Sequence, residues 1–232
     1  MTETTSGVNV HFTTRDFNGA AEYFAGYGED LWLELSSVLA NLQLQLQPSD
    51  QAGIVGRPIF DPKATNAALT STAAEWGWRK VVVPPELQPF GKDWDGGKES
   101  VLAEWQFSNY PFLWNNIIRS EAVFQSGAVL RPLTRSVEAL VIVTKTGSLP
   151  ASNSTLYFEQ AEAQIDTVTT LGVFEIPIRL VGLSVPPGIS QLEGDWNLYS
   201  GRYARVPEAA PRTFDVSWGR AGQYGNLAAR FS

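Results

Sequence analysis

The stretch DWDGGKESVLAEWQF, residues 93–107, constrains the fold more than any other part of this sequence. Its two ends, from about Trp94 to Asp95 and from Val101 to Phe107, have the composition of strands. The segment Gly96-Gly97-Lys98-Glu99 between them is a plausible turn. The chain then continues with helical length from about Tyr110 to Gln125. The stretch therefore predicts a β-hairpin that is followed by a helix.

Three polar residues of this hairpin, Asp95, Glu104 and Gln106, carry its chemistry. On adjoining strands Asp95 and Glu104 would point into one pocket, and Gln106 would project from the same face as Glu104, whereas Trp105 should face the core. Two carboxylates and an amide at one sheet edge can hold a divalent ion and align a water molecule. The spacing matches the D-(x)n-(D/E)-x-K signature of nucleases, with glutamine in place of lysine. Spacing alone also fits ordinary acids on a solvated strand, and for the nearby Asp93 a surface role is favoured.

Outward from the hairpin, the apolar pattern predicts further helices and strands. One helix begins near Glu29, but its end is ambiguous because Leu42 to Gln47 alternates like a strand. Asp61-Pro62 opens a second helix, with proline in its first turn, and Ser154 can cap a later one. The remaining expected bounds are a second-helix end near 76, a later helix over about 155–171, and strands over 139–143 and 175–183.

The order of these elements predicts an α/β fold with a mixed central β-sheet flanked by helices. A chain of 232 residues with 44% hydrophobic residues fits one domain with a packed core, so we expect a single domain over 1–232. The segment from about 190 to 232 is rich in Gly, Pro and Arg, which predicts a C-terminal tail of loops and short strands.

Composition excludes several kinds of active site. The sequence has no cysteine and one histidine, His11, which excludes thiolate catalysis and cysteine-ligated zinc. Carboxylates remain as the obvious metal ligands, and they favour hard cations such as Mg²⁺. The net charge of −7 argues against a general nucleic-acid binder, although five arginines stand against three acids from Asp195 onward. Without a membrane-length apolar run or the features of a signal peptide, we expect a cytoplasmic protein with no membrane partner.

Several stretches resemble the Bgl II family of type II restriction endonucleases. This family is a subgroup of the PD-(D/E)xK nucleases in which glutamine stands where most relatives carry lysine. Residues 104–116, EWQFSNYPFLWNN, are similar to its active-site segment, and Arg119-Ser120-Glu121 continues the match. The other matches run in the same order along most of the chain: SDQA at 49–52, IFDP at 59–62, PASNS at 150–154, IPIRLVGL at 176–183, and the group Arg202, Tyr203 and Arg205.

The resemblance implies a PD-(D/E)xK restriction endonuclease-like fold and a role for each residue of the hairpin. Asp95 and Glu104 would ligate Mg²⁺, and Gln106 would help to position the attacking water. Glutamine can orient a water but supplies neither positive charge nor a base, so more of the catalysis would depend on the metal ion.

The resemblance also implies residues that contact DNA. Ser108 and Asn109 would enter the major groove, and Asn153 and Ser154 would form a second reading loop, because Asn and Ser offer directed hydrogen bonds to base edges. A turn position is the alternative for Asn153. Arg119 would lie near the DNA, with a surface ion pair as the alternative. The tail residues would contact bases or, equally well, phosphates; they are Arg202, Tyr203 and Arg205.

The function implied is metal-dependent cleavage of double-stranded DNA at a short palindrome centred on GATC. Palindromic cutting implies a homodimer in which each subunit cuts one strand, with the helix from Tyr110 or the one near 155–171 at the interface. A cognate DNA methyltransferase would act beside the enzyme. The alternatives are a repair or recombination nuclease without fixed sequence and a catalytically silent DNA-binding relative. The base-reading residues count against the first, and the intact carboxylate–glutamine set counts against the second.

Overall fold

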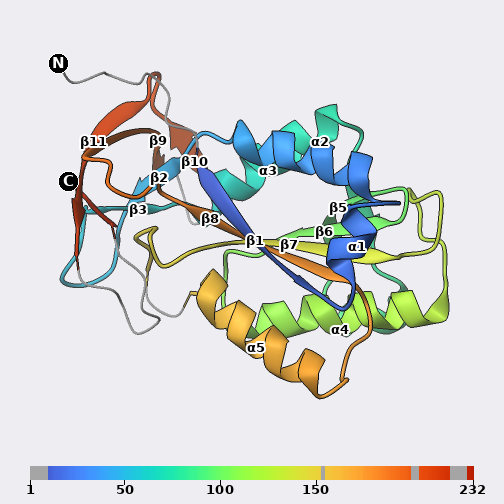
Figure 1. The fold of residues 1–232 in the computed structure, drawn as a ribbon. Coiled ribbons are helices and arrows are strands. Elements are labelled where there is room, and N and C mark those ends of the chain that lie inside the picture. The colour runs from blue at the N-terminus through green and yellow to red at the C-terminus, as the bar shows by residue number, and fades with distance from the viewer. Residues whose placement is uncertain (1–9, 153–154, 200–203, 220–228) are drawn as a thin grey trace.

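Two β-sheets and a set of helices organise the chain (Figure 1). The computed structural model describes residues 10–152, 155–199, 204–219 and 229–232. Helices lie on both faces of the first sheet, and the second sheet lies beside it (Figure 1). This arrangement confirms the expected α/β fold with a mixed sheet flanked by helices.

The first sheet has six strands in the order β1-β8-β7-β6-β5-β4. It is mixed, because β7 pairs in parallel with both β6 and β8, whereas the outer pairs are antiparallel. The hairpin predicted from the sequence is therefore the β5–β6 pair next to the parallel centre. The strand bounds are β1 His11–Phe17, β4 Arg79–Val82, β5 Asp93–Lys98, β6 Val101–Trp105, β7 Ala139–Lys145 and β8 Ile178–Ser184.

Alternating side chains of the central strands supply two cores, one on each face of this sheet. On β6, Val101 and Ala103 belong to one core and Leu102 to the other. Strand β7 is buried at every position, as expected for a parallel strand that is covered on both faces. The first face is covered by α1 Ala20–Phe24, α2 Glu29–Ala40 and α3 Pro62–Glu75, and the second by α4 Tyr110–Ser126 and α5 Phe158–Thr170 (Figure 1). A 3₁₀ helix, η1 Pro85–Phe90, packs against α4.

The second sheet joins the C-terminal part of the chain to a segment near residue 45. Its order is β12-β11-β9-β2-β3, with β10 paired to β9, and β2 runs parallel to β9. The expected short strands are present in β10 and β12, whereas β9 is nine residues long and its Trp196 packs in the core, so this part is more regular than the sequence predicts. The bounds are β2 Gln45–Pro48, β3 Pro58–Phe60, β9 Gln191–Tyr199, β10 Arg205–Pro207, β11 Arg212–Trp218 and β12 Ala229–Phe231.

The ambiguous end of the helix that begins at Glu29 lies at Ala40, and part of the alternating segment after it belongs to β2, which pairs with β9. The predicted turn of the hairpin differs from the structure in its extent. The glycines Gly96 and Gly97 lie within β5 rather than in the turn. A Cβ on Gly97 would lie 2.4 Å from Val81 Cγ2, so close packing requires this glycine. The turn itself is at Glu99, whose φ is 52°.

Helix α5 begins later than its predicted start. Its first residue is Phe158 and its N-cap is Tyr157, which makes no side-chain capping bond. The predicted start near 155 is therefore about three residues too early, and the predicted capping residue, Ser154, lies outside the described residues. Over the ranges that the structure describes, no helix is both long and apolar enough to cross a bilayer.

Candidate active site

Asp95 lies at a β-bulge. Along the pairing of β4 with β5, β5 contains one residue more than β4, and a bulge of this kind re-aims a side chain. The β5–β6 ladder ends at Gly96, and beyond it the Asp95 carboxylate takes the place of a backbone acceptor. Asp95 Oδ2 accepts a hydrogen bond from Trp105 N at 2.9 Å and another from Asn66 Nδ2, on α3, at 3.4 Å. Asp95 is thereby held at the end of β6, beside Glu104.

Glu104 and Asp95 form a coupled pair of carboxyl groups. Glu104 is 5% exposed, and burial raises its pKa well above the usual value. The charge of Asp95 raises the pKa of Glu104 further, whereas the Arg119 guanidinium lowers it. Burial also raises the pKa of Asp95, against the opposing hydrogen bond from the Trp105 backbone. Both carboxyl groups therefore resist ionisation, and a divalent cation bound between them would stabilise their ionised forms.

Helix α4 supports Glu104 and Gln106 from one of its faces. Arg119 Nη2 donates to Glu104 Oε1 in a buried ion pair, and Asn116 Nδ2 donates to Gln106 Oε1 at 2.9 Å. Asn116 and Arg119 are three residues apart, so they are neighbours on the helix surface. Glu104 and Gln106 therefore project to the same side of the sheet, as their spacing predicts, and Trp105 packs in the opposite core.

The amide of Gln106 is fixed at both of its ends. Its Oε1 accepts from Asn116, and its Nε2 donates to Ser108 Oγ at 2.9 Å and to Asn109 O at 3.5 Å. These partners define which end of the amide is oxygen and which is nitrogen. Ser108 and Asn109 are both exposed, and Asn109, the N-cap of α4, makes no side-chain capping bond. The two predicted base-reading residues thus directly adjoin the catalytic strand.

Arg119 is only 3% exposed. Its guanidinium carbon lies 4.9 Å from the Trp94 ring centroid, and a Cβ on Gly91 would lie 1.8 Å from Nη1. The surface ion pair considered above is therefore wrong, because the pair is buried and its partner is Glu104. The contact of Arg119 with DNA that the resemblance implies stays a prediction.

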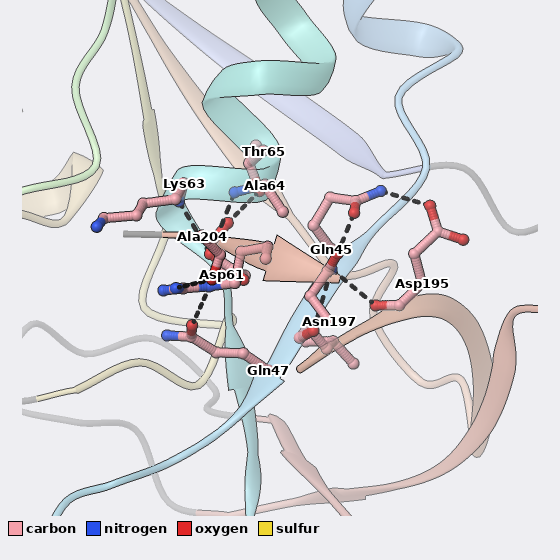
Figure 2. A network of polar contacts seen from close by, with 11 residues as sticks. Gln45, Gln47, Asp61, Lys63, Ala64, Thr65, Asp195, Asn197 and Ala204 are labelled. Atoms are coloured by element: carbon pink, nitrogen blue, oxygen red, sulfur yellow. Dashed lines mark hydrogen bonds and ion pairs between the residues drawn. The ribbon is translucent and has the colours of Figure 1, made fainter. Parts of the chain in front are cut away.

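Arg205, on β10, is held by Asp61. The fully buried Asp61 caps α3, since its Oδ1 accepts from Lys63 N at 2.9 Å and from Ala64 N at 3.1 Å. Figure 2 shows these contacts at the start of the helix. Arg205 Nε donates to Asp61 Oδ2 at 2.8 Å and to Gln47 Oε1 at 3.1 Å. Its side chain, 11% exposed, ties β10 to β2 and α3, and a DNA contact by Arg205 stays a prediction.

The network around Asp61 continues into the second sheet. Gln45 Nε2 donates to Asp195 Oδ2 at 2.6 Å, and Gln45 Oε1 accepts from Asn197 Nδ2 at 3.0 Å (Figure 2). These contacts join β2 to β9 beside the parallel pairing of their backbones. The second sheet is consequently anchored at the start of α3, the helix that also contacts Asp95.

The donor set fits a hard divalent cation. Asp95 and Glu104 offer the carboxylate oxygens that Mg²⁺ prefers, and Mg²⁺ usually retains several waters. Among the residues that the structure describes, no three His, Cys, Asp or Glu side chains gather at one point, so water or DNA phosphate oxygens would complete the coordination. Asp93 does not join the pair, because its side chain is 42% exposed and forms an ion pair with Lys80 at 3.4 Å.

Four predicted DNA contacts fall on parts of the chain outside the described residues: Asn153, Ser154, Arg202 and Tyr203. Two supporting residues, Asn66 and Asn116, were missed by the sequence reasoning. For Asn116 the sequence did contain a signal, because Asn116 and Arg119 are neighbours on one helix, as Glu104 and Gln106 are on one strand, so the two pairs can meet. The sequence contained no such signal for Asn66, because its contact with Asp95 depends on how α3 packs against β5.

The fold is that of a restriction endonuclease, and the paired carboxylates fit the metal site expected of the PD-(D/E)xK class. The family described as "Restriction endonuclease BglII/BglIII" matches residues 12–183, and the chain belongs to this family. It is therefore a type II site-specific deoxyribonuclease. The type II restriction enzyme BglII of Bacillus subtilis is 38% identical over 190 residues, which are 82% of this chain and 81% of that protein.

Two solved structures share the fold. The crystal structure of restriction endonuclease BglII complexed with a DNA 16-mer matches with a TM-score of 0.84 and 32% identity, over 96% of this chain and 99% of that one. The crystal structure of free BglII matches with a TM-score of 0.67 and 28% identity, over 94% and 99% of the two chains. Of these two, the complexed form has the higher TM-score.

Proposed function

We propose that this enzyme uses Mg²⁺ to cleave both strands of DNA at a short palindrome centred on GATC. The observation that carries the proposal is the convergence of Asp95, Glu104 and Gln106 at the end of the β5–β6 hairpin, with α4 behind them. A surface arrangement of ordinary acids would not bury Glu104 or hold both ends of the Gln106 amide. The resemblance of the reading loops supports the GATC centre.

Each residue of the site has a distinct task in this mechanism. Asp95 and Glu104 hold the metal ion once both are ionised. When bound, Mg²⁺ acidifies water and screens the scissile phosphate. Gln106 orients the attacking water through its amide, which Asn116 and Ser108 hold in place so that little reorganisation is needed. Arg119 favours the ionised form of Glu104 and fixes its position.

The residues that read DNA are proposed to lie in three segments. Ser108 and Asn109 follow Gln106 directly, so a base contact there would be coupled to the position of the catalytic amide. The higher TM-score with the DNA-complexed BglII structure supports a DNA-bound arrangement of this chain. The other segments are Asn153 with Ser154, and Arg202 with Tyr203 and Arg205; Arg119 is included on the resemblance alone.

A homodimer is part of the proposal, since a palindrome is matched by a symmetric pair of subunits. Helix α4 carries two exposed apolar residues, Phe112 at 50% and Ile118 at 36% exposure, which favours it over α5 as the interface helix. Each chain would contribute a single domain. The enzyme would act in the cytoplasm beside a cognate DNA methyltransferase.

The test is digestion of phage DNA with Mg²⁺, followed by sequencing of the fragment ends. Discrete bands whose ends all map to one palindrome containing GATC support the proposal. A smear would indicate a nuclease without fixed sequence, and a gel shift without cutting would indicate a silent relative. Ends that map to a different core would show that the reading residues are wrongly assigned.

A further inference from the structure

Lys145 is a buried lysine at the end of β7 for which the proposed reaction has no use. It is 1% exposed, and among the described residues no carboxylate pairs with it. Burial lowers the pKa of Lys145 to about 7. Because burying an ammonium group is costly, its retention calls for a specific use of its hydrogen-bond donors.

The donors of Lys145 reach two separate segments of the chain. Its Nζ donates to Phe107 O at 3.4 Å, to Leu156 O at 2.9 Å and to Thr155 Oγ1. An ammonium group has three N–H donors, so all of them are used and none remains for a ligand. Lys145 therefore acts as a bridge between these segments.

Further bonds connect the same segments around this lysine. Thr155 Oγ1 donates to Phe107 O at 3.2 Å, and Leu156 N donates to Ser108 O at 3.1 Å. A pocket of about 110 Å³ is lined by residues of both segments, among them Ser108, Asn109 and Thr155, and by Lys145 itself. The segment 107–109 contains one pair of proposed base-reading residues, and the segment 155–156 directly follows the other pair.

We propose that Lys145 is a positioning residue for sequence recognition, which fixes the distance between segment 107–109 and segment 155–156. This inference rests on the proposed function, in that Ser108 and Asn109, and the pair that precedes Thr155 in the sequence, are taken to read bases. A protein that contacts bases with two segments discriminates less well between sites when the two segments can move relative to each other. Loss of the bridge should therefore reduce the preference for the cognate site over altered sites more than it reduces the cleavage rate on the cognate site.

The experiment compares wild type with Lys145→Met and Thr155→Val. Methionine has a similar length but no donors, and valine keeps the shape of threonine without its hydroxyl. Cleavage rates are measured on the cognate site and on sites with one altered base pair. We expect the ratio of these rates to fall by about fivefold or more in both variants, because a bidentate contact to a base is worth about 1–3 kcal/mol.

The matched control is Lys98→Met, which removes a partly buried lysine bonded to Glu34 at the other end of the hairpin. Its rate ratio should equal that of wild type, even if its thermal stability falls. If Lys145→Met does not fold, Thr155→Val alone decides the matter. Folded variants whose rate ratio stays within about twofold of wild type would overturn the inference. A wild type without any site preference would instead overturn the proposed function.

Discussion

At the scale of single residues, three contacts fix the orientation of the polar side chains of the candidate site. Arg119 holds Glu104, Asn116 holds Gln106, and the Trp105 backbone holds Asp95. Each supporting group comes from an element that the core already fixes. The polar atoms of the proposed site are thus already in place without DNA, which would reduce the reorganisation that the proposed reaction requires.

Replacing either carboxylate by its amide should abolish cleavage and leave specific DNA binding intact. Asp95→Asn and Glu104→Gln keep the shape of each side chain but weaken the metal site. Losing the metal's several kcal/mol of transition-state stabilisation should reduce the rate by about 1,000-fold or more. Single-turnover cleavage and a metal-free gel shift measure the two effects. Near wild-type cutting by either variant would remove that residue from the site.

Gln106→Ala should slow cleavage without removing metal binding, because glutamine only orients water. Asn116→Ala should reproduce part of this loss, since it frees one end of the same amide. We expect a decrease of about 10- to 100-fold for Gln106→Ala and less for Asn116→Ala. The dependence of the rate on Mg²⁺ concentration provides the check: the half-saturating concentration should stay as in wild type. An unchanged rate for Gln106→Ala would exclude it from catalysis.

At the scale of elements, α3 connects the second sheet to the catalytic hairpin. Asp61 caps the helix and binds Arg205 at its start, and Asn66 reaches Asp95 one turn further on. The sequence motif Asp61-Pro62 thus serves as a helix start and also as the attachment point of β10. The C-terminal strands are consequently part of the folded core and not an independent tail.

Asp61→Ala should destabilise the protein by about 3 kcal/mol, because it removes a helix cap and leaves the Arg205 guanidinium without its counterion. Asp61→Asn retains a capping oxygen but presents an amide NH₂ to Arg205, so its cost should be about 1 kcal/mol smaller. Urea denaturation measures both. The exposed Asp166→Ala on α5 is the control, with an expected effect below about 0.5 kcal/mol. Equal stability of Asp61→Ala and wild type would contradict this account.

At the scale of the whole molecule, two sheets form the scaffold that carries the proposed metal site at the β5–β6 hairpin. Gln106 supplies neither charge nor a base, and the guanidinium of Arg119 is engaged by Glu104. The chemistry should therefore depend strongly on the identity of the ion.

Calcium should support specific DNA binding without cutting, whereas Mg²⁺ should support both. Ca²⁺ accepts the same carboxylate oxygens, but it is larger, coordinates more loosely and acidifies water less. A gel shift in Ca²⁺, followed by digestion after excess Mg²⁺ is added, gives the readout. Efficient cutting in Ca²⁺, or in chelator without metal, would rule out a site of this kind.

The unfolding free energy should rise between about pH 7 and pH 10 because of Lys145. Its pKa is lowered by burial to about 7 in the folded chain, whereas in the unfolded chain it returns to about 10.4. In this window the unfolded state binds more protons, so increasing pH favours the folded state. The difference in melting temperature between wild type and Lys145→Met, followed over this range, isolates the effect. A difference that does not vary with pH would mean that Lys145 is not buried in this way.

The sequence by itself determined the elements whose signals are local. The β5–β6 hairpin, the start of α3 at Asp61-Pro62 and the face shared by Glu104 and Gln106 all follow from periods of two or about 3.6 residues and from capping chemistry. These signals act between residues a few positions apart, so they are present in the chain before it folds. The resemblance of residues 104–116 to the Bgl II family indicates this hairpin as the candidate active site.

Only the tertiary structure decided what depends on distant partners. Strand β2 forms at Gln45–Pro48 because β9 pairs with it, and Arg119 is buried because Glu104 lies opposite α4. The bulge that turns Asp95 toward Glu104 arises from the pairing of β5 with β4. The bridge made by Lys145 likewise requires 107–109 and 155–156 to meet. No local pattern encodes these contacts, because their free energy exists only once packing has brought the partners together.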